Sequence, residues 1–522
     1  MERTSVIAVV TATVLAAGSL TVAGPAAADV SLDLPRQAAP VAQENRGSIA
    51  YLTARYKISE DEALRRLALQ KLAPALDAEL AKKFPKTFAG SYLDQAGGGR
   101  LVVNSTDPAG MTAALAAAGD SAHVVAAKVK WSLAELTATE ARLRRTVGDP
   151  HETTARKAEF AIDVPGNTVA VYQRAGMTAP SSARLSAAAA DAAQARPAVA
   201  DATLTAAVVA EAGRAEVRQL VAGAEKTGPV TMDAPVGPGC DTRQCGPPMR
   251  GGMRLNVRRS QAAPTGSSTG YLNPWYGQCT NGFNVSDNRG WNYIMTAGHC
   301  MVGSYKVGIN RTYSAGTYTP VSYEVHNYEN GCNGSDCGPT YPYDYSIQPY
   351  QVNDGYNWYD YWSGPYAKNQ VVSWCWWTSS TWQGCVDGTF AIRGFYTYNS
   401  IAVGWVVCGT GSGDAGSDSG YTRNVNYVPG TRCGEVTGKD GGIRTNICTR
   451  PGDSGGPLFS EIDGMAYGIL STGHAGTGAC PASPAGTEWS SYTPVSNIHS
   501  HVTTQLANTG EPALGFRIRT TP

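Results

Sequence analysis

The sequence predicts two folding units, an α+β unit in the first half of the chain and an all-β unit in the second. Three observations support this division. The chain has 522 residues, more than one ordinary domain holds. All 12 cysteines lie between Cys240 and Cys480. The first half is rich in Ala, Leu, Arg and Glu, which favour helix, whereas short strand-like runs separated by turn residues fill the second.

The N-terminus predicts an export signal over residues 1–28. A short polar start is followed by an apolar run of small residues, and Ala26-Ala27-Ala28 gives an A-x-A cleavage pattern. The alternative is a membrane anchor, but Thr, Ser and Gly interrupt the run. Export agrees with the cysteine content, because disulfides persist in oxidising surroundings. We therefore expect a secreted, extracellular protein.

Residues 29–235 predict repeated helix and hairpin units followed by a linker. Ser59 and Glu62 form a capping box that starts the second piece of the first helix. Helix is predicted for 49–72, 124–145 and 187–224, hairpins for 92–103 and 160–172, and a Pro-rich linker for 228–239.

Residues 236–522 predict a β sandwich or barrel. Short apolar runs such as 293–295, 401–407 and 466–470 lie between Gly, Asn, Asp and Pro residues, and a last helix is expected over 495–506. The formal net charge is zero, which gives no electrostatic reason to expect nucleic acid or an anionic membrane as a partner.

Three segments of the second half carry residues typical of nucleophilic catalysis. Thr296-Ala297-Gly298-His299-Cys300 follows an apolar strand, Asp344 opens another strand, and Gly452-Asp453-Ser454-Gly455-Gly456-Pro457 is a glycine-rich turn. A serine hydroxyl needs a base to take its proton, histidine titrates near neutrality, and a carboxylate fixes the histidine tautomer. We expect the backbone N–H groups of Gly452 and Ser454 to form the oxyanion hole.

These motifs resemble the two signatures of the chymotrypsin-like serine proteases, and the order His, Asp, Ser is that of the family. The preceding Asn446-Ile447-Cys448-Thr449-Arg450-Pro451 is similar to the secreted, streptogrisin-like branch of actinobacteria, in which a pro-region precedes the protease. The resemblance implies a double β-barrel protease domain over 236–522 and an α+β pro-region over 29–235 that assists folding and inhibits the protease until it is cleaved.

The aspartate is the least specific of the three residues, and Asp336, Asp354 and Asp360 remain its rivals. The resemblance suggests the disulfides Cys279–Cys300, Cys408–Cys433 and Cys448–Cys480. Nearest-neighbour pairing then leaves Cys240–Cys245, Cys332–Cys337 and Cys375–Cys385, although sequence cannot prove connectivity. A zinc site is the alternative for the short cysteine loops; we expect no metal and no cofactor.

The expected substrate-binding residues are Asn446, at the base of the specificity pocket, and Ser471, Thr472 and Gly473, on the strand that pairs with substrate. The region that corresponds to the base of the pocket is Asn446-Ile447 and holds no aspartate, so the resemblance implies preference for an uncharged side chain. We expect protein or peptide substrates, the chain's own pro-region as a partner, and a monomer.

Two features depart from the family pattern. The branch has an arginine directly after the cysteine that is Cys408 here, but this chain has Gly409. Asp453 therefore needs another partner, for which Arg423 and Arg432 are candidates. The Tyr- and Trp-rich stretch 350–382 is the second departure, and it predicts either a stacking surface or additional barrel core.

The competing hypotheses are an active endopeptidase, a catalytically silent homologue that binds carbohydrate or protein through its aromatic stretch, and a non-peptide acyl hydrolase. The intact set of His299, Asp344 and Ser454 favours the first over the second. The chain has no lipase-type Gly-x-Ser-x-Gly elbow, which disfavours the third.

Overall fold

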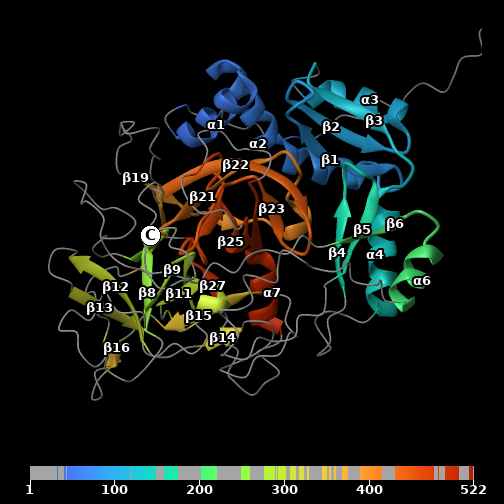
Figure 1. Cartoon of the computed structure of the whole chain (residues 1–522). Helices are drawn as coiled ribbons and strands as arrows, with labels where there is room; N and C mark the ends of the chain where they lie inside the picture. The colour runs from blue at the N-terminus through green and yellow to red at the C-terminus, as the bar shows by residue number, and fades with distance from the viewer. Residues whose placement is uncertain are drawn as a thin grey trace, which may run out of the picture.

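A computed structural model shows an α+β first half, the predicted pro-region, beside a β-rich second half, the predicted protease half (Figure 1). The described residues are 32, 34, 40, 42, 44–118, 120, 122–147, 158–173, 202–219, 249–258, 276–288, 290, 292–300, 306–312, 317–322, 326–328, 344–349, 352–353, 358–359, 367–373, 388–413, 430–474, 480, 488–504 and 516–520. The predicted signal peptide, the linker and most of the aromatic stretch lie outside them.

The pro-region contains two related units. After helix α1 (Arg46–Tyr56), the first unit consists of α2 (Glu60–Lys83), β1 (Phe88–Asp94), β2 (Arg100–Ser105), α3 (Pro108–Leu115), a 3₁₀ turn (Ala116–Ala118) and β3 (Val124–Lys128). The second consists of α4 (Leu133–Val147), β4 (Ala158–Asp163), β5 (Thr168–Gln173), α6 (Ala202–Ala210) and β6 (Ala215–Gln219).

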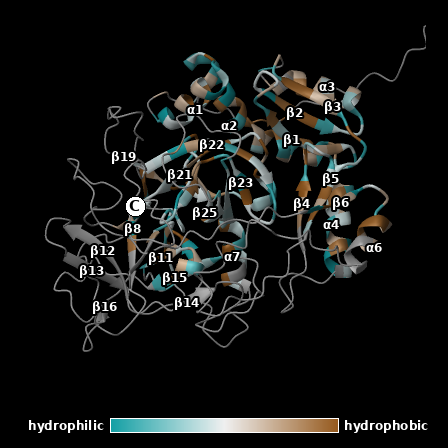
Figure 2. Ribbon diagram, viewed as in Figure 1, coloured by the Kyte–Doolittle hydropathy of each residue, from teal (hydrophilic) through white to brown (hydrophobic). Residues whose placement is uncertain are grey.

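In both units a hairpin is followed by a helix and a third strand that runs parallel to the second strand of the hairpin. Strands β2, β4 and β5 are rich in apolar residues (Figure 2), and these residues pack against the helices in the core of each unit. The helix and hairpin repeat expected from sequence is therefore part of a larger α-β-β-α-β unit.

Three helix predictions need correction. The first helical stretch extends beyond 49–72, since α1 begins at Arg46 and α2 ends at Lys83. Residues 124–128, predicted as helix, form β3, because the valines of this segment pair with β2. Within 187–224, the described residues form α6 and then β6, whose partner β5 lies more than 40 residues earlier. Local helix propensity carries no information about such distant strand partners.

The first part of the protease half is built from small sheets. A five-stranded sheet has the order β14 (His326–Tyr328), β15 (Tyr345–Pro349), β11 (Asn292–Thr296), β10 (Phe283–Ser286) and β27 (Arg517–Ile518). A four-stranded sheet has the order β13 (Thr317–Ser322), β12 (Lys306–Thr312), β8 (Arg254–Arg258) and β9 (Tyr276–Thr280). A three-stranded sheet has the order β19 (Gly388–Ala391), β18 (Ala367–Ser373) and β7 (Met249–Gly251). A two-stranded sheet pairs β16 (Val352–Asn353) with β17 (Trp358–Tyr359).

The last part of the chain closes into a β-barrel. Its strands are β21 (Val406–Gly411), β22 (Gly430–Lys439), β23 (Ile443–Thr445), β26 (Ser490–Pro494), β25 (Met465–Gly473) and β24 (Pro457–Phe459), each paired with the next, and β24 pairs back to β21. The short strand β20 (Gly394–Phe395) pairs in parallel with β25, and a 3₁₀ turn spans Tyr398–Ser400. Helix α7 (Val495–Thr504) follows β26, as predicted. The strand expected over 401–407 begins only at Val406. The predicted class, a mostly β half with a β-barrel after an α+β region, is confirmed; of the expected double barrel, the described residues close this one.

The pro-region contacts the closed barrel directly, with α1 and α2 lying over β21 and β22 (Figure 1). Gln70 of α2 is 3% exposed, and its side-chain amide bonds both the N–H and the carbonyl of Val406, at 2.6 and 2.9 Å. The Leu93 N–H donates to the Val403 carbonyl at 3.0 Å. Polar side chains of the pro-region therefore satisfy backbone groups at the start of β21.

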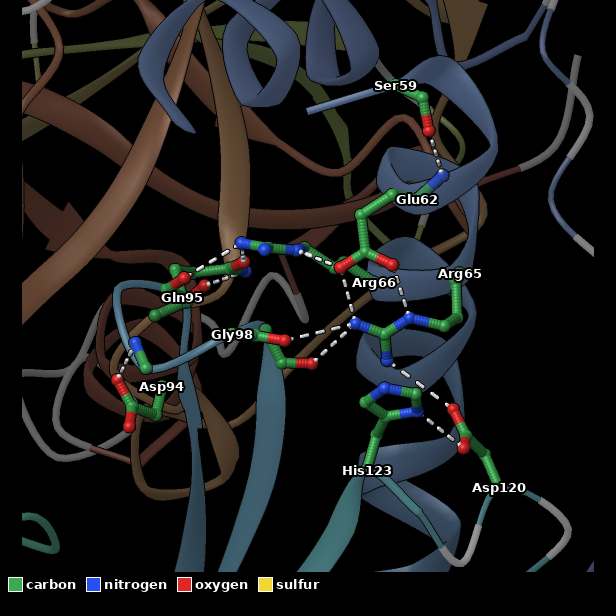
Figure 3. A network of polar contacts seen from close by, with 12 residues as sticks. Ser59, Glu62, Arg65, Arg66, Asp94, Gln95, Gly98, Asp120 and His123 are labelled. Atoms are coloured by element: carbon green, nitrogen blue, oxygen red, sulfur yellow. Dashed lines mark hydrogen bonds and ion pairs between the residues drawn. The ribbon is translucent and has the colours of Figure 1, made fainter. Parts of the chain in front are cut away.

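A polar network holds α2 against the first hairpin (Figure 3). The Ser59 hydroxyl accepts from the Glu62 N–H, as the capping box predicts, and Glu62 binds Arg65 and Arg66. Arg66 also donates to the Gln95 carbonyl at 2.8 Å, and Gln95 reaches the Gly404 carbonyl at 2.9 Å. The network thus connects the cap of α2 to the protease half.

Candidate active site

The histidine is positioned by two paired strands. Strand β11 ends at Thr296, directly before the 3₁₀ turn that carries His299, and its neighbour β15 begins just after Asp344. Because Thr296 pairs with Ser346, the end of β11 lies beside the start of β15. The Asp344 carboxylate accepts from the His299 backbone N–H at 2.8 Å and lies 2.6 Å from the ring Nδ1.

Asp344 is held from a second direction by Ser471 of β25. The Ser471 hydroxyl donates to Asp344 Oδ2 at 2.7 Å, the same oxygen that faces the His299 ring. Burial acts to raise the pKa of Asp344, but the charge of His299 and the hydrogen bonds from His299 and Ser471 outweigh it and lower the pKa. The geometry therefore favours an ionised Asp344 that orients the imidazole. Its rivals Asp336, Asp354 and Asp360 lie outside the described residues.

The serine turn can only be built from glycine at several positions. Gly452 and Gly455 have φ values of +92° and +83°. A Cβ on Gly455 would lie 1.9 Å from Thr296 Oγ1, and one on Gly456 would lie 2.3 Å from the Thr410 carbonyl oxygen. The turn is thus pressed against both the histidine segment and the barrel, which explains the glycine-rich motif.

The serine and histidine turns are neighbours in space. The Ser454 carbonyl accepts from the Thr280 N–H at 2.8 Å and lies 3.8 Å from the sulfur of Cys300, the residue after His299. Ser454 is fully buried in the full-length chain, and its hydroxyl makes no hydrogen bond within the described residues. Catalytic hydrogen bonds are often long before substrate binds, so this geometry is compatible with proton transfer to His299.

Asp453, beside the serine, is 1% exposed and is held by backbone groups. Its carboxylate accepts from the N–H groups of Gly413 and Arg450, both at 2.8 Å. Arg432 is the cross-strand neighbour of Gly409, and Arg432, Gly409 and Asp453 line one small cavity. Arg423, the other cation proposed from sequence, lies outside the described residues.

The predicted substrate-binding residues have different surroundings. The Asn446 side chain accepts from the Glu435 N–H and donates to the Tyr51 hydroxyl of α1, both at 2.8 Å, so it faces the pro-region. The Ser471 side chain is engaged by Asp344, while Thr472 and Gly473 pair with Ser491 and Ser490 on β26. The role of Ser471 as a support for Asp344 was missed, because nothing in the sequence indicates that the two residues meet.

Three disulfides connect the described cysteines. They join Cys279 with Cys300, Cys408 with Cys433, and Cys448 with Cys480. The first links β9 to the histidine turn, and the third anchors the segment before Ser454. The cysteines of the other three proposed pairs lie outside the described residues. Within the described residues, the one group of possible metal ligands is Cys408, Cys433 and Glu461, and its cysteines form the second disulfide.

Two comparisons with known proteins found serine protease relatives. Residues 61–125, which span most of the first pro-region unit, match the family described as Alpha-lytic protease pro N-terminal. Over 208 residues the chain is 26% identical to Serine protease 2 of Streptomyces fradiae, which covers 39% of this chain and 91% of the relative. The chain is thus similar to a serine protease, and its residues 61–125 are similar to the pro-region of one. The predictions of this resemblance and of a serine protease enzyme are confirmed.

Two solved structures with detectable similarity are described as a protease and as an alpha-lytic protease homologue. A Nocardiopsis protease is 19% identical to this chain, and the match covers 47% of this chain and 93% of the Nocardiopsis chain with a TM-score of 0.25. An alpha-lytic protease homologue, N4, is 20% identical, and the match covers 48% of this chain and 95% of the homologue's chain, also with a TM-score of 0.25. Within the described residues, no helix is long and apolar enough to cross a membrane.

Proposed function

We propose that this chain is a secreted serine endopeptidase, made as a proenzyme, that hydrolyses peptide bonds through an acyl-enzyme. Ser454 attacks the scissile carbonyl, His299 takes the serine proton and returns it to the leaving amine, and Asp344 holds the imidazole. The observation that carries the proposal is the double contact of Asp344 with the His299 backbone and ring, beside the glycine turn of Ser454.

The oxyanion hole is assigned to the N–H groups of Gly452 and Ser454. The positive φ of Gly452 supports this assignment, since it gives the turn a backbone conformation that side-chain-bearing residues rarely adopt. Two donors aimed at the developing oxyanion would each lower the barrier by roughly 3 kcal/mol.

The direct test is labelling of the protein with a serine-directed fluorophosphonate, together with digestion of casein. Ser454→Ala and His299→Ala should abolish both reactions, whereas Ser460→Ala, at a buried serine outside the motif, should leave them intact. Absence of labelling in processed wild-type protein would overturn the enzymatic assignment and favour a silent homologue.

The pro-region is proposed to assist folding of the protease and to inhibit it. Support comes from the family match at 61–125 and from the contacts of Gln70 with the first residue of β21 and of Leu93 and Gln95 with the loop before it. Residues 236–522 produced alone should fold slowly or remain inactive until the pro-region is added. Rapid folding to full activity without it would refute the folding role.

A further inference from the structure

Arg450 is the residue whose backbone holds Asp453 in the serine turn. Its N–H donates to the Asp453 carboxylate at 2.8 Å, and its carbonyl accepts from the Asp453 N–H at 3.0 Å. Asp453 lies between Gly452 and Ser454, whose N–H groups are the assigned oxyanion donors. Any movement of the Arg450 backbone is therefore transmitted to both donors.

The side chain of Arg450 is buried and makes a two-pronged ion pair with Glu488. Arg450 is 2% exposed and Glu488 is 9% exposed. The guanidinium Nη1 and Nη2 donate to Glu488 Oε2 and Oε1 at 3.0 and 2.9 Å, and Nη1 also donates to the Thr449 carbonyl at 2.9 Å. This geometry fixes both distance and orientation, because two parallel bonds join two planar groups.

Glu488 lies at the start of the strand pair that flanks the site. Strand β26 begins two residues later and pairs with β25, with Ser490 opposite Gly473. The pairing continues outward, since the His474 N–H donates to the Trp489 carbonyl at 2.8 Å. The ion pair thus connects the serine turn to the end of β25 that carries Ser471, Thr472 and Gly473.

Stability alone does not account for such a pair. Removing two charges from water costs several kcal/mol per ion, and well-packed apolar residues often serve a fold equally well. The two-pronged geometry is better suited to fixing the register of two segments. The disulfide of Cys448 with Cys480 anchors the same segment two residues before Arg450.

We propose that the Arg450–Glu488 pair is a positioning device that sets the oxyanion turn against the substrate strand β25. Arg450 and Glu488 are positioning residues and touch no reacting atom. The inference rests on the proposed protease function, and it assigns the pair a role in the chemical step in place of a role in folding alone.

The test compares single and paired substitutions in the full chain after processing. Arg450→Met or Glu488→Leu alone leaves one buried charge unpaired and can prevent folding. The double variant Arg450→Met/Glu488→Leu removes both charges and keeps similar volumes, so it should fold with a Tm near that of the wild type. We expect its kcat on a chromogenic peptide to fall about 10- to 100-fold, less than the roughly 100- to 1000-fold loss for a removed oxyanion donor because both donors are displaced and not removed, with KM changed less than about threefold.

Two further variants complete the experiment. Arg450→Lys keeps the charge but cannot form the two parallel hydrogen bonds with Glu488, and should have an intermediate kcat. Tyr396→Phe removes a hydrogen bond to the Asp463 carboxylate elsewhere in the protease half, and should leave kcat unchanged. A folded double variant with wild-type kcat would overturn the positioning role. If the double variant does not fold, wild-type kcat in Arg450→Lys would overturn it instead. Failure of the wild type to react with fluorophosphonate would overturn the proposed function.

Discussion

Replacing Gln70 by leucine should weaken the attachment of the pro-region to the barrel more than any exposed substitution on α2. Leucine is similar in size and favours helix, so the helix itself should persist. The change removes both hydrogen bonds to Val406, whose side chain is 1% exposed. Leaving a buried N–H and carbonyl unsatisfied costs roughly 1 to 3 kcal/mol each, so we expect a loss of about 2 to 6 kcal/mol.

The assay is urea unfolding of the full chain carrying Ser454→Ala, which prevents self-cleavage under the proposed function. Tryptophan fluorescence can follow the transition, because Trp405 is buried next to the contact. The control is Lys82→Leu, since Lys82 lies on the same helix with a side chain 76% exposed. If the two variants unfold at the same urea concentration, the Gln70 contact contributes nothing and the reasoning fails.

Three further predictions concern the site and the pro-region. Ser471→Ala removes one hydrogen bond to Asp344, so kcat/KM on a peptide substrate should fall about fivefold, as expected for a loss of ~1 kcal/mol; an unchanged value would show that Asp344 needs no second support. Gly455→Ala should prevent folding or activity, because its Cβ would collide with Thr296 Oγ1 at 1.9 Å, and soluble active protein would disprove the tightness of the turn. Asp77→Asn should stabilise the chain at pH 8 but not at pH 4. Burial raises the pKa of Asp77 to about 7, against the opposing effects of Ser91 and Lys439, so the folded state disfavours the charged form. The free energy of unfolding of the wild type therefore declines by up to about 4 kcal/mol as pH rises to 7. Thermal unfolding of both proteins at the two pH values would show whether the variant loses this pH dependence of stability.

The turns that carry His299 and Ser454 were predictable because each motif is a short continuous run of residues. Gly455 and Gly456 directly follow the serine, so the motif can be recognised in the sequence, although the contacts that require glycine there are made with the distant Thr296 and Thr410. The capping box at Ser59 was found for the same reason, since it depends on one turn of helix. Asp344 could be proposed from chain order, but its contacts with His299 come from pairing between β11 and β15.

Features that depend on distant partners were not predictable. Residues 124–128 have helical neighbours, and only the parallel pairing with β2 makes them a strand. Residues 401–405 read as the start of a strand, but the Gly404 φ of +83° and the contacts with the pro-region make them a loop. Asn446 was expected at the substrate pocket, whereas its side chain is bound by Tyr51 and Glu435, nearly 400 residues apart from each other.

One strand of the barrel connects the pro-region to the serine turn. At its start, the N–H and carbonyl of Val406 are satisfied by Gln70 of the pro-region. Just beyond its end, the Gly413 N–H donates to the Asp453 carboxylate beside Ser454. A pro-region that orders the start of β21 therefore also favours the backbone path that places Gly413 against Asp453. This continuity gives a physical basis for the proposed assistance in folding, and it predicts that Gln70→Leu should slow the appearance of fluorophosphonate-reactive Ser454 during refolding.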